Sequence, residues 1–270
     1  MFYRYATRDI RLATDLDDMF TGEPCFIVGG APDAKQFGEI ARAHPGAHIL
    51  AINNAGTVVP RTLRVGGDKP ACYSESILVD PTIMKFAVIS RRNEMVMGRR
   101  WAEWPNTFFF GTNEGFNPRN FLDRSRDLVW WKNTFFIAIQ LAYRLGFREI
   151  YLAGCGFKIS KEQQYAWETK LGDDEIAWNT RLYNDSVAQL KALMPHFQQR
   201  GLHVTSCTPG SLANDVLPFE EPAKAWERIV ARIPAPNTVD KPHSSKLVEL
   251  KKEEVKPIVA MHLAKCETGG

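Results

Sequence analysis

Short apolar segments that stop at glycine or asparagine constrain the fold of this chain more than any other feature. Residues 25–28 (Cys-Phe-Ile-Val) stop at Gly29-Gly30, and residues 48–52 (His-Ile-Leu-Ala-Ile) stop at Asn53-Asn54. Between them, apolar residues recur at helical spacing from residue 37 to residue 41. Apolar strands that alternate with helices are typical of a parallel sheet covered by helices on both faces. The sequence therefore predicts a Rossmann-like α/β fold with a mostly parallel sheet.

The clearest helix and strand pair lies in the second half of the chain. Residues 134–145 place apolar side chains along one helical face, and residues 149–153 form an apolar strand that ends at Gly154. A long helix over residues 176–199 and a final strand over residues 203–206 follow the same pattern. This second unit extends the predicted parallel sheet.

Three further strands are expected in the middle of the chain, at residues 71–73, 85–89 and 107–110. The loop that follows, up to Asn120, is polar and rich in glycine and asparagine. Such a loop is typical of a pocket wall, and we expect it to form a small lid region.

The last part of the chain differs in composition from the rest. From Pro234 onward it holds Pro-Ala-Pro, Lys-Pro-His-Ser-Ser and Lys-Lys-Glu-Glu-Val-Lys-Pro, which are too polar and too often interrupted by proline to pack. We therefore expect a single domain over residues 1–233 and a flexible polar tail over residues 234–270.

Composition excludes several classes of protein. A net charge of +3 over 270 residues does not favour a protein that grips a nucleic-acid backbone. Five widely spaced cysteines without a Cys-x-x-Cys pair disfavour a disulfide framework and a zinc knuckle. The first 20 residues lack the apolar core of a signal peptide, and residues 134–145 are too few to span a bilayer. We expect a cytoplasmic protein without a membrane span, and a homo-oligomer remains possible.

Small and amide residues follow most of the predicted strands. In open parallel sheets, ligands bind beyond the carboxyl ends of the strands, where helix N-termini face the cleft. The pattern suits the close approach of a phosphate and a base, and it predicts a pocket for a nucleotide or a nucleotide-linked substrate. The residues expected to contact this ligand are Gly29, Gly30, Asn53, Asn54, Ser74, Gly154 and Ser211.

Common catalytic motifs are absent from the sequence. It contains no Walker loop, no His-Glu-x-x-His and no Gly-x-Ser-x-Gly, which disfavours P-loop kinases, zincins and α/β hydrolases.

Several segments, taken in order, resemble a known family. They are residues 26–33 (Phe-Ile-Val-Gly-Gly-Ala-Pro-Asp), residues 51–54 (Ala-Ile-Asn-Asn), residues 141–157, residues 165–167 (Tyr-Ala-Trp) and residues 207–214 (Cys-Thr-Pro-Gly-Ser-Leu-Ala-Asn). Together they look like the bacterial sialyltransferases of glycosyltransferase family 42 and the related 6-hydroxymethylpterin pyrophosphokinase-like proteins. The likeness spans about residues 24–218 and implies a GT-A-type variant of the Rossmann-like sheet.

The resemblance implies a sugar transferase that uses a CMP-linked donor and needs neither a metal ion nor another cofactor. Gly30 and Ala31 would then lie against the donor phosphate, Asn53 would contact donor or acceptor, and Ser211 would face the nucleotide. Tyr165 matches a tyrosine that hydrogen-bonds the departing phosphate.

Two lysines stand where the family has other residues. Lys158 takes the position of a second phosphate tyrosine, and its ammonium group can neutralise a leaving phosphate. Lys132 takes the position of an arginine, which keeps the charge but loses the bidentate fork. Lys158, Tyr165 and Lys132 are therefore the expected catalytic residues.

The histidine that serves the family as general base has no counterpart here. The histidine of this region, His196, lies near the far end of the long helix, and Asp173, Asp174 or Glu175 are possible substitutes. The sequence does not identify the acceptor, which can be a glycan, a protein or a nucleic acid.

Two other functions remain open at this stage. One is a pyrophosphokinase-like transferase that uses ATP and magnesium, with Asp68 and Asp80 as the nearest candidate ligands of the metal. The other is a non-catalytic descendant of the fold that binds a ligand.

Overall fold

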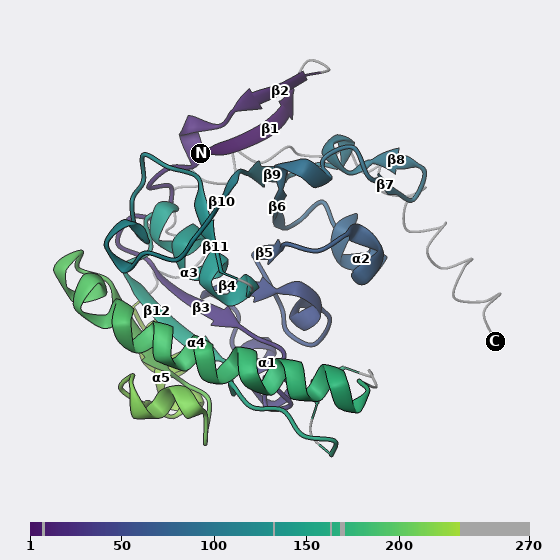
Figure 1. Ribbon diagram of the computed structural model, residues 1–270. Coiled ribbons are helices and arrows are strands. Elements are labelled where there is room, and N and C mark those ends of the chain that lie inside the picture. The colour runs from purple at the N-terminus through teal and green to yellow at the C-terminus, as the bar shows by residue number, and fades with distance from the viewer. Residues whose placement is uncertain (7–8, 132, 163, 168–170, 233–270) are drawn as a thin grey trace.

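The computed structural model describes residues 1–6, 9–131, 133–162, 164–167 and 171–232. Within these residues the centre is a nine-stranded sheet (Figure 1). In spatial order its strands are β13 (His203–Ser206), β12 (Glu149–Ala153), β3 (Pro24–Val28), β4 (His48–Ile52), β5 (Leu63–Gly66), β6 (Met84–Val88), β9 (Thr107–Phe110), β1 (Phe2–Ala6) and β2 (Asp9–Leu12). All neighbours from β13 to β9 are parallel, whereas β1 and β2 are antiparallel. The predicted Rossmann-like, mostly parallel sheet is confirmed.

The remaining elements are short strands and helices. Two small sheets pair β7 (Met95–Val96) with β8 (Arg99–Arg100) and β10 (Thr112–Glu114) with β11 (Leu128–Trp130). The helices are α1 (Ala34–Ala43), α2 (Glu75–Leu78), α3 (Thr134–Arg144), α4 (Asp173–Gln199) and α5 (Pro222–Val230). None of the described helices has both the length and the apolar character needed to cross a membrane.

Helices cover both faces of the sheet, as expected. Every residue of α3 is buried, and Ile27 of β3 and Leu50 of β4 point into the same core as this helix. On the opposite face, Phe26 packs against Phe37 of α1 and Trp226 of α5, with ring centroids 5.0 Å apart in both pairs. Because side chains alternate along a strand, the apolar run of β3 supplies both cores. This two-sided burial explains why β3 consists of apolar residues after Pro24.

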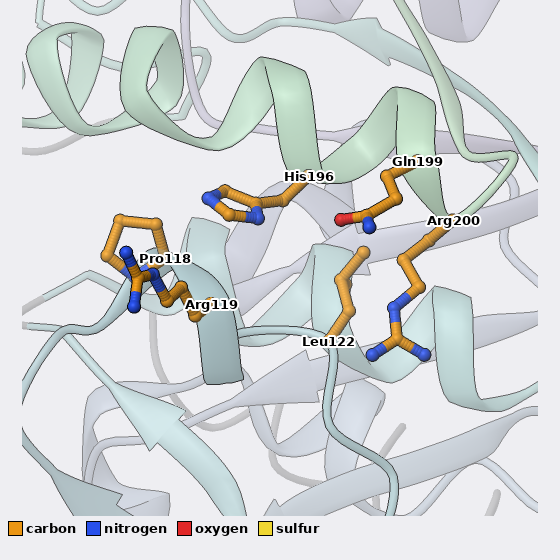
Figure 2. A pocket seen from close by; sticks show the side chains of 6 residues that line it. All are labelled: Pro118, Arg119, Leu122, His196, Gln199 and Arg200. Atoms are coloured by element: carbon orange, nitrogen blue, oxygen red, sulfur yellow. The ribbon is translucent and has the colours of Figure 1, made fainter.

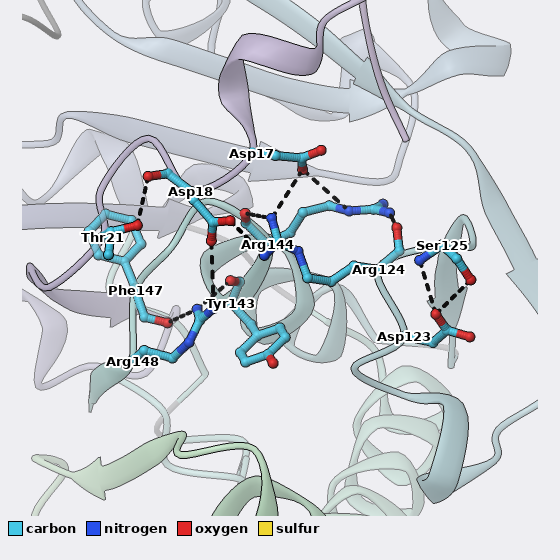
Figure 3. Close-up of polar contacts among 10 residues, drawn as sticks. All are labelled: Asp17, Asp18, Thr21, Asp123, Arg124, Ser125, Tyr143, Arg144, Phe147 and Arg148. Atoms are coloured by element: carbon cyan, nitrogen blue, oxygen red, sulfur yellow. Dashed lines mark hydrogen bonds and ion pairs between the residues drawn. The ribbon is translucent and has the colours of Figure 1, made fainter.

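Charge pairs attach the segment before β3 to the end of α3 (Figure 3). Arg144 is 3% exposed and lies 3.6 Å from a carboxylate oxygen of Asp17, and Arg124 lies 2.7 Å from Asp18. The backbone N–H groups of Asp18 and Phe20 donate to the carbonyls of Arg144 and Leu145. These bonds satisfy carbonyls that a helix end leaves free, so they hold α3 in place on the sheet.

One expected strand was wrong, and three observed strands of the nine-stranded sheet were not expected. Residues 71–73 are not a strand, because Pro70–Cys72 is a 3-10 helix in which the N–H of Tyr73 donates to the carbonyl of Pro70 at 2.9 Å. The strands β5 and β1–β2 were not expected at all. The predicted tail, residues 234–270, lies outside the described residues.

Candidate functional site

The carboxyl ends of β3, β4 and β12 meet at a cavity of about 620 Å³. Because these strands are adjacent and parallel, the loops that follow them open at the same edge of the sheet. Six of the residues expected to contact a ligand lie in the lining of this cavity. They are Gly29, Gly30, Ala31, Asn53, Asn54 and Gly154.

The glycines at the ends of β3 and β12 allow the two loops to touch. The N–H of Gly29 donates to the carbonyl of Ala153, and the N–H of Ala31 donates to the carbonyl of Gly154, both at 2.9 Å. A Cβ atom on Gly29 would lie 2.5 Å from the carbonyl oxygen of Gly154, and Gly154 itself has a φ of +61°. The fold therefore favours glycine at positions 29 and 154 whether or not a ligand binds there.

Gly30 lies beneath two aromatic rings. A Cβ atom there would come within 2.5 Å of Trp167 and 3.0 Å of Tyr165. These rings stack with centroids 5.1 Å apart and planes 1° apart, and the N–H of Ala166 donates to the carbonyl of Gly30 at 2.9 Å. Tyr165 and Trp167 both line the cavity, so the aromatic pair forms part of its wall above the end of β3.

Tyr165 interacts with a tyrosine of α4. Burial, together with the neighbouring hydroxyl of Tyr165, raises the pKa of Tyr183. The aromatic wall over β3 therefore lies close to the helix that closes the other side of the cavity.

Lys158 lies on the rim of the cavity, where its side chain is exposed. It also lines an adjoining recess of about 340 Å³ together with Ala31, Asp33 and Thr208. Burial raises the pKa of Asp33, an effect that backbone hydrogen bonds and the charge of Lys158 partly offset. Lys158 therefore borders both the main cavity and the adjoining recess. Lys132, the other expected cation, lies outside the described residues.

The side chain of Asn54 joins the loop after β4 to residues 72–74. Its side-chain amide donates to the carbonyl of Cys72 at 3.1 Å and accepts the N–H of Ser74 at 3.0 Å. Asn53 adopts a left-handed φ of +53°, and its amide oxygen accepts the hydroxyl of Tyr73 at 3.4 Å. The predicted role of both asparagines in ligand binding stays a prediction, beside this observed role in holding residues 70–74.

Two expected contact residues do not line the cavity. The hydroxyl of Ser211 donates to the carbonyl of Cys155 at 2.7 Å and accepts the N–H of Ala213 at 3.1 Å. The hydroxyl of Ser74 is bonded to that of Ser76 at 2.8 Å. Ser211 thus supports the loop after β12 from behind, and Ser74 lies beyond the cavity wall.

Helices α3 and α4 supply a side of the cavity of which the sequence analysis named only Glu175. Asn133 caps the N-terminus of α3 by accepting the N–H of Phe135 at 2.9 Å, and this positive end of the helix dipole faces the cavity. From α4, residues at helical spacing form one wall: Glu175, Trp178, Asn179, Leu182 and Tyr183. That spacing, i, i+3, i+4, i+7 and i+8, was the signal that could have located this face.

His196 cannot serve the cavity as a base. It lies 21 residues after Glu175 on the same helix, a separation of about 30 Å at 1.5 Å per residue. Figure 2 shows it beside Arg119 and Arg200 around a separate pocket of about 300 Å³. The loop after β9, which we expected to act as a lid, contributes nothing to the main cavity and lines this pocket and another one instead.

No family model and no curated protein matches the sequence. Among solved structures, the chain is similar to a mammalian sialyltransferase, with a TM-score of 0.37 and 12% identity over 67% of this chain and 68% of that one. It is also similar to a mammalian sialyltransferase in complex with Gal-beta-1-3GalNAc-ortho-nitrophenol, with a TM-score of 0.35 and 11% identity over the same shares.

Proposed function

We propose that this protein is a transferase that takes a sugar from a CMP-linked donor bound in the main cavity, without a metal ion. The observation that carries the proposal is the set of groups at the carboxyl edge of the sheet. Glycine loops, an exposed lysine and a stacked aromatic pair face one space of about 620 Å³. Such groups suit a phosphate, a base and a sugar ring, and ligand pockets of this size are common in enzymes. The resemblance of these segments to glycosyltransferase family 42 also supports the proposal.

In this proposal Lys158 and Tyr165 assist the leaving phosphate. Negative charge grows on the phosphate oxygens as the bond to the sugar breaks, so an ammonium group and a hydroxyl aimed there stabilise the transition state more than the bound donor. Gly30 and Ala31, beside the aromatic wall, would hold the phosphate within reach of Lys158.

The acceptor hydroxyl needs a base, and the lining offers two carboxylates, Asp68 and Glu175. One oxygen of Glu175 accepts the N–H of Gly172 at 2.9 Å, which leaves the other for a substrate. Asp173, another candidate from the sequence, instead pairs with Lys161 at 2.8 Å. Comparing Asp68→Asn with Glu175→Gln distinguishes the two candidates, because loss of the base lowers kcat by about 100-fold or more.

The two aspartates that a magnesium-dependent pyrophosphokinase would use are not grouped. Asp68 lines the cavity, whereas Asp80 lies 3.2 Å from Arg61 and accepts hydrogen bonds from Thr82. Within the described part of the chain, no three histidine, cysteine or acidic residues lie close enough together to hold a metal ion. Asp68 and Asp80 therefore do not face one common space in this structure.

Hydrolysis of a CMP-linked sugar tests the proposed function. We expect Lys158→Ala and Tyr165→Phe each to lower kcat by about tenfold to a thousandfold, with a much smaller change in donor affinity by calorimetry. The matched controls are Lys161→Ala and Tyr5→Phe. Lys161 pairs with Asp173 outside the cavity, and Tyr5 bonds to Arg100 at the far edge of the sheet. Both controls should keep the wild-type rate.

The outcomes separate the remaining functions. Donor binding without turnover in the wild-type protein would indicate a ligand-binding descendant of the fold. Turnover that requires ATP and magnesium would indicate a pyrophosphokinase. Equal rates in wild type, Lys158→Ala and Tyr165→Phe would remove both residues from the mechanism.

A further inference from the structure

A fully buried arginine lies next to the cavity and takes no part in the proposed transfer. Arg64 is on β5 and has 0% exposure. Its strand neighbours Leu63 and Val65 point into the core around α3, so Arg64 points to the opposite face of the sheet.

None of the three guanidinium nitrogens of Arg64 has a hydrogen bond of good geometry to a described residue, and the side-chain oxygen that interacts with the group is the neutral hydroxyl of Tyr73. The flat faces of the guanidinium are covered instead: the central carbon lies 3.9 Å from the ring centroid of Tyr73 and 5.7 Å from that of Trp101. Burial lowers the pKa of Arg64 to about 10, and the neighbouring hydroxyl of Tyr73 offsets only part of this effect. The group therefore stays charged at neutral pH without a bonded anion.

The charged neighbours of Arg64 have both signs: Arg61 and Lys85 are cationic groups, whereas the carboxylate of Asp68 raises the pKa of Arg64 without forming a hydrogen bond to it. Lys85 is the register partner of Arg64 on β6, and the charge of Arg64 lowers the pKa of Lys85. The charge of Arg61 in turn lowers the pKa of Arg64. The carboxylate of Asp80 is engaged by Arg61 at 3.2 Å. A buried charge without a bonded anion destabilises a protein strongly, and an anion supplied by a ligand would relieve that cost.

The two buried cations point in opposite directions along the sheet. The ammonium group of Lys85 donates to the carbonyls of Asp80 and Ile83, which lie before it in the chain. The guanidinium of Arg64 extends the other way, since a Cβ atom on Gly66 would lie 2.4 Å from its Nη2 and 2.6 Å from the hydroxyl of Tyr73. Arg64 is thus directed toward the carboxyl edge of the sheet, where the cavity lies.

Tyr73 connects the buried guanidinium to the cavity. Its ring stacks on Arg64, and it also lines the cavity with Asn53 and Asp68. Its hydroxyl accepts the N–H of Asp68 at 2.7 Å and donates to Asn53 at 3.4 Å, the longer of these being a weak bond. A shift of this one side chain would therefore bring Arg64 into contact with the cavity.

We propose that Arg64 is an oxyanion-binding residue of the cavity, which donates paired N–H groups to a carboxylate or phosphate of the ligand when Tyr73 moves aside. A guanidinium fork matches the two oxygens of such a group. The proposal uses the same cavity as the proposed function, but it does not need glycosyl transfer. It holds for any ligand that carries an accessible oxyanion.

Thermal unfolding of the full chain tests this proposal with Arg64→Met. Removing an unpaired buried charge should raise the Tm of the ligand-free protein by at least about 2 °C. Millimolar inorganic phosphate, CMP or the carboxylate sugar N-acetylneuraminate, compared with chloride at equal ionic strength, should raise the Tm of wild type but not of Arg64→Met. Lys85→Met is the matched control, and it should keep the wild-type response.

The three probes identify the source of the oxyanion. A response to phosphate and CMP assigns the site to a phosphate, and a response to N-acetylneuraminate alone assigns it to a carboxylate. The proposal is overturned if Arg64→Met lowers the Tm or does not fold, if it responds as wild type does, or if no probe stabilises wild type. Absence of sugar transfer would leave a phosphate response intact, so the two proposals fail separately.

Discussion

Replacing Gly29 by alanine tests whether contact between the loops after β3 and β12 builds the cavity. The new Cβ atom would lie 2.5 Å from the carbonyl oxygen of Gly154 and 3.0 Å from the sulfur of Cys155, whereas ordinary contacts begin at 3.4 Å. The two loops would have to separate by roughly 1 Å.

Hydrogen bonds on both sides of Gly29 oppose this separation. Gly29 donates to Ala153 and Ala31 donates to Gly154, both at 2.9 Å, so the loops cannot part without lengthening one of these bonds. Forced overpacking of this kind costs about 1–3 kcal/mol of the free energy of unfolding. For a domain of this size, that predicts a Tm lower by about 2–12 °C.

Differential scanning calorimetry and urea unfolding measure the effect, with Gly30→Ala as the matched control. There the new Cβ atom meets the ring ends of Trp167 and Tyr165, which line the cavity and have space to move. Gly30→Ala should therefore change the Tm less and the response to CMP more. A Tm for Gly29→Ala within about 1 °C of wild type, or an equal fall in both variants, would refute the reasoning.

Two further substitutions test the supporting structure. Ser211→Ala removes the bond to Cys155 and the cap of Ala213, so urea unfolding should show a loss of about 1–2 kcal/mol. The Tm shift with CMP should be unchanged, and its disappearance would instead support the nucleotide contact expected from sequence. Burial lowers the pKa of Lys85 to about 7, far below the pKa of a lysine in an unfolded chain. Between pH 7 and about 10 the unfolded state therefore binds more protons than the folded state. The folded state gains stability as the pH rises through this range. The free energy of unfolding of wild type minus that of Lys85→Met should therefore rise with pH over this range. A difference independent of pH would contradict the lowered pKa of Lys85.

The central strands could be predicted because burial on both faces leaves a pattern in the sequence. β4, β9, β12 and β13 match the expected residues, and β3 and β6 begin one residue earlier than expected. β3, β4, β9 and β12 are mostly apolar because a strand between two helical layers has no solvent-facing side, whereas β13 at the edge of the sheet holds only one apolar residue, Val204. β5 was missed because it has four residues and Arg64 interrupts its apolar pattern.

The edges of the fold left weaker patterns. The strands β1 and β2 carry several charged residues, as edge strands often do, and no apolar run marks them. Residues 71–73 seemed strand-like by composition, but Pro70 starts a 3-10 helix there.

For the candidate site, the sequence by itself determined the parallel sheet and the edge at which a ligand can bind. Buried apolar runs that alternate with helices indicate parallel strands, and small residues at the strand ends mark where chains approach closely. Only the tertiary structure decided which side chains share that space. It placed Tyr73, Trp178 and Tyr183 in the cavity wall, left Ser74 and Ser211 outside it, and separated His196 from it. The reason is that hydrogen bonds and charges act across the fold: whether Ser211 faces a ligand, or Arg64 finds a partner, depends on residues distant in the chain.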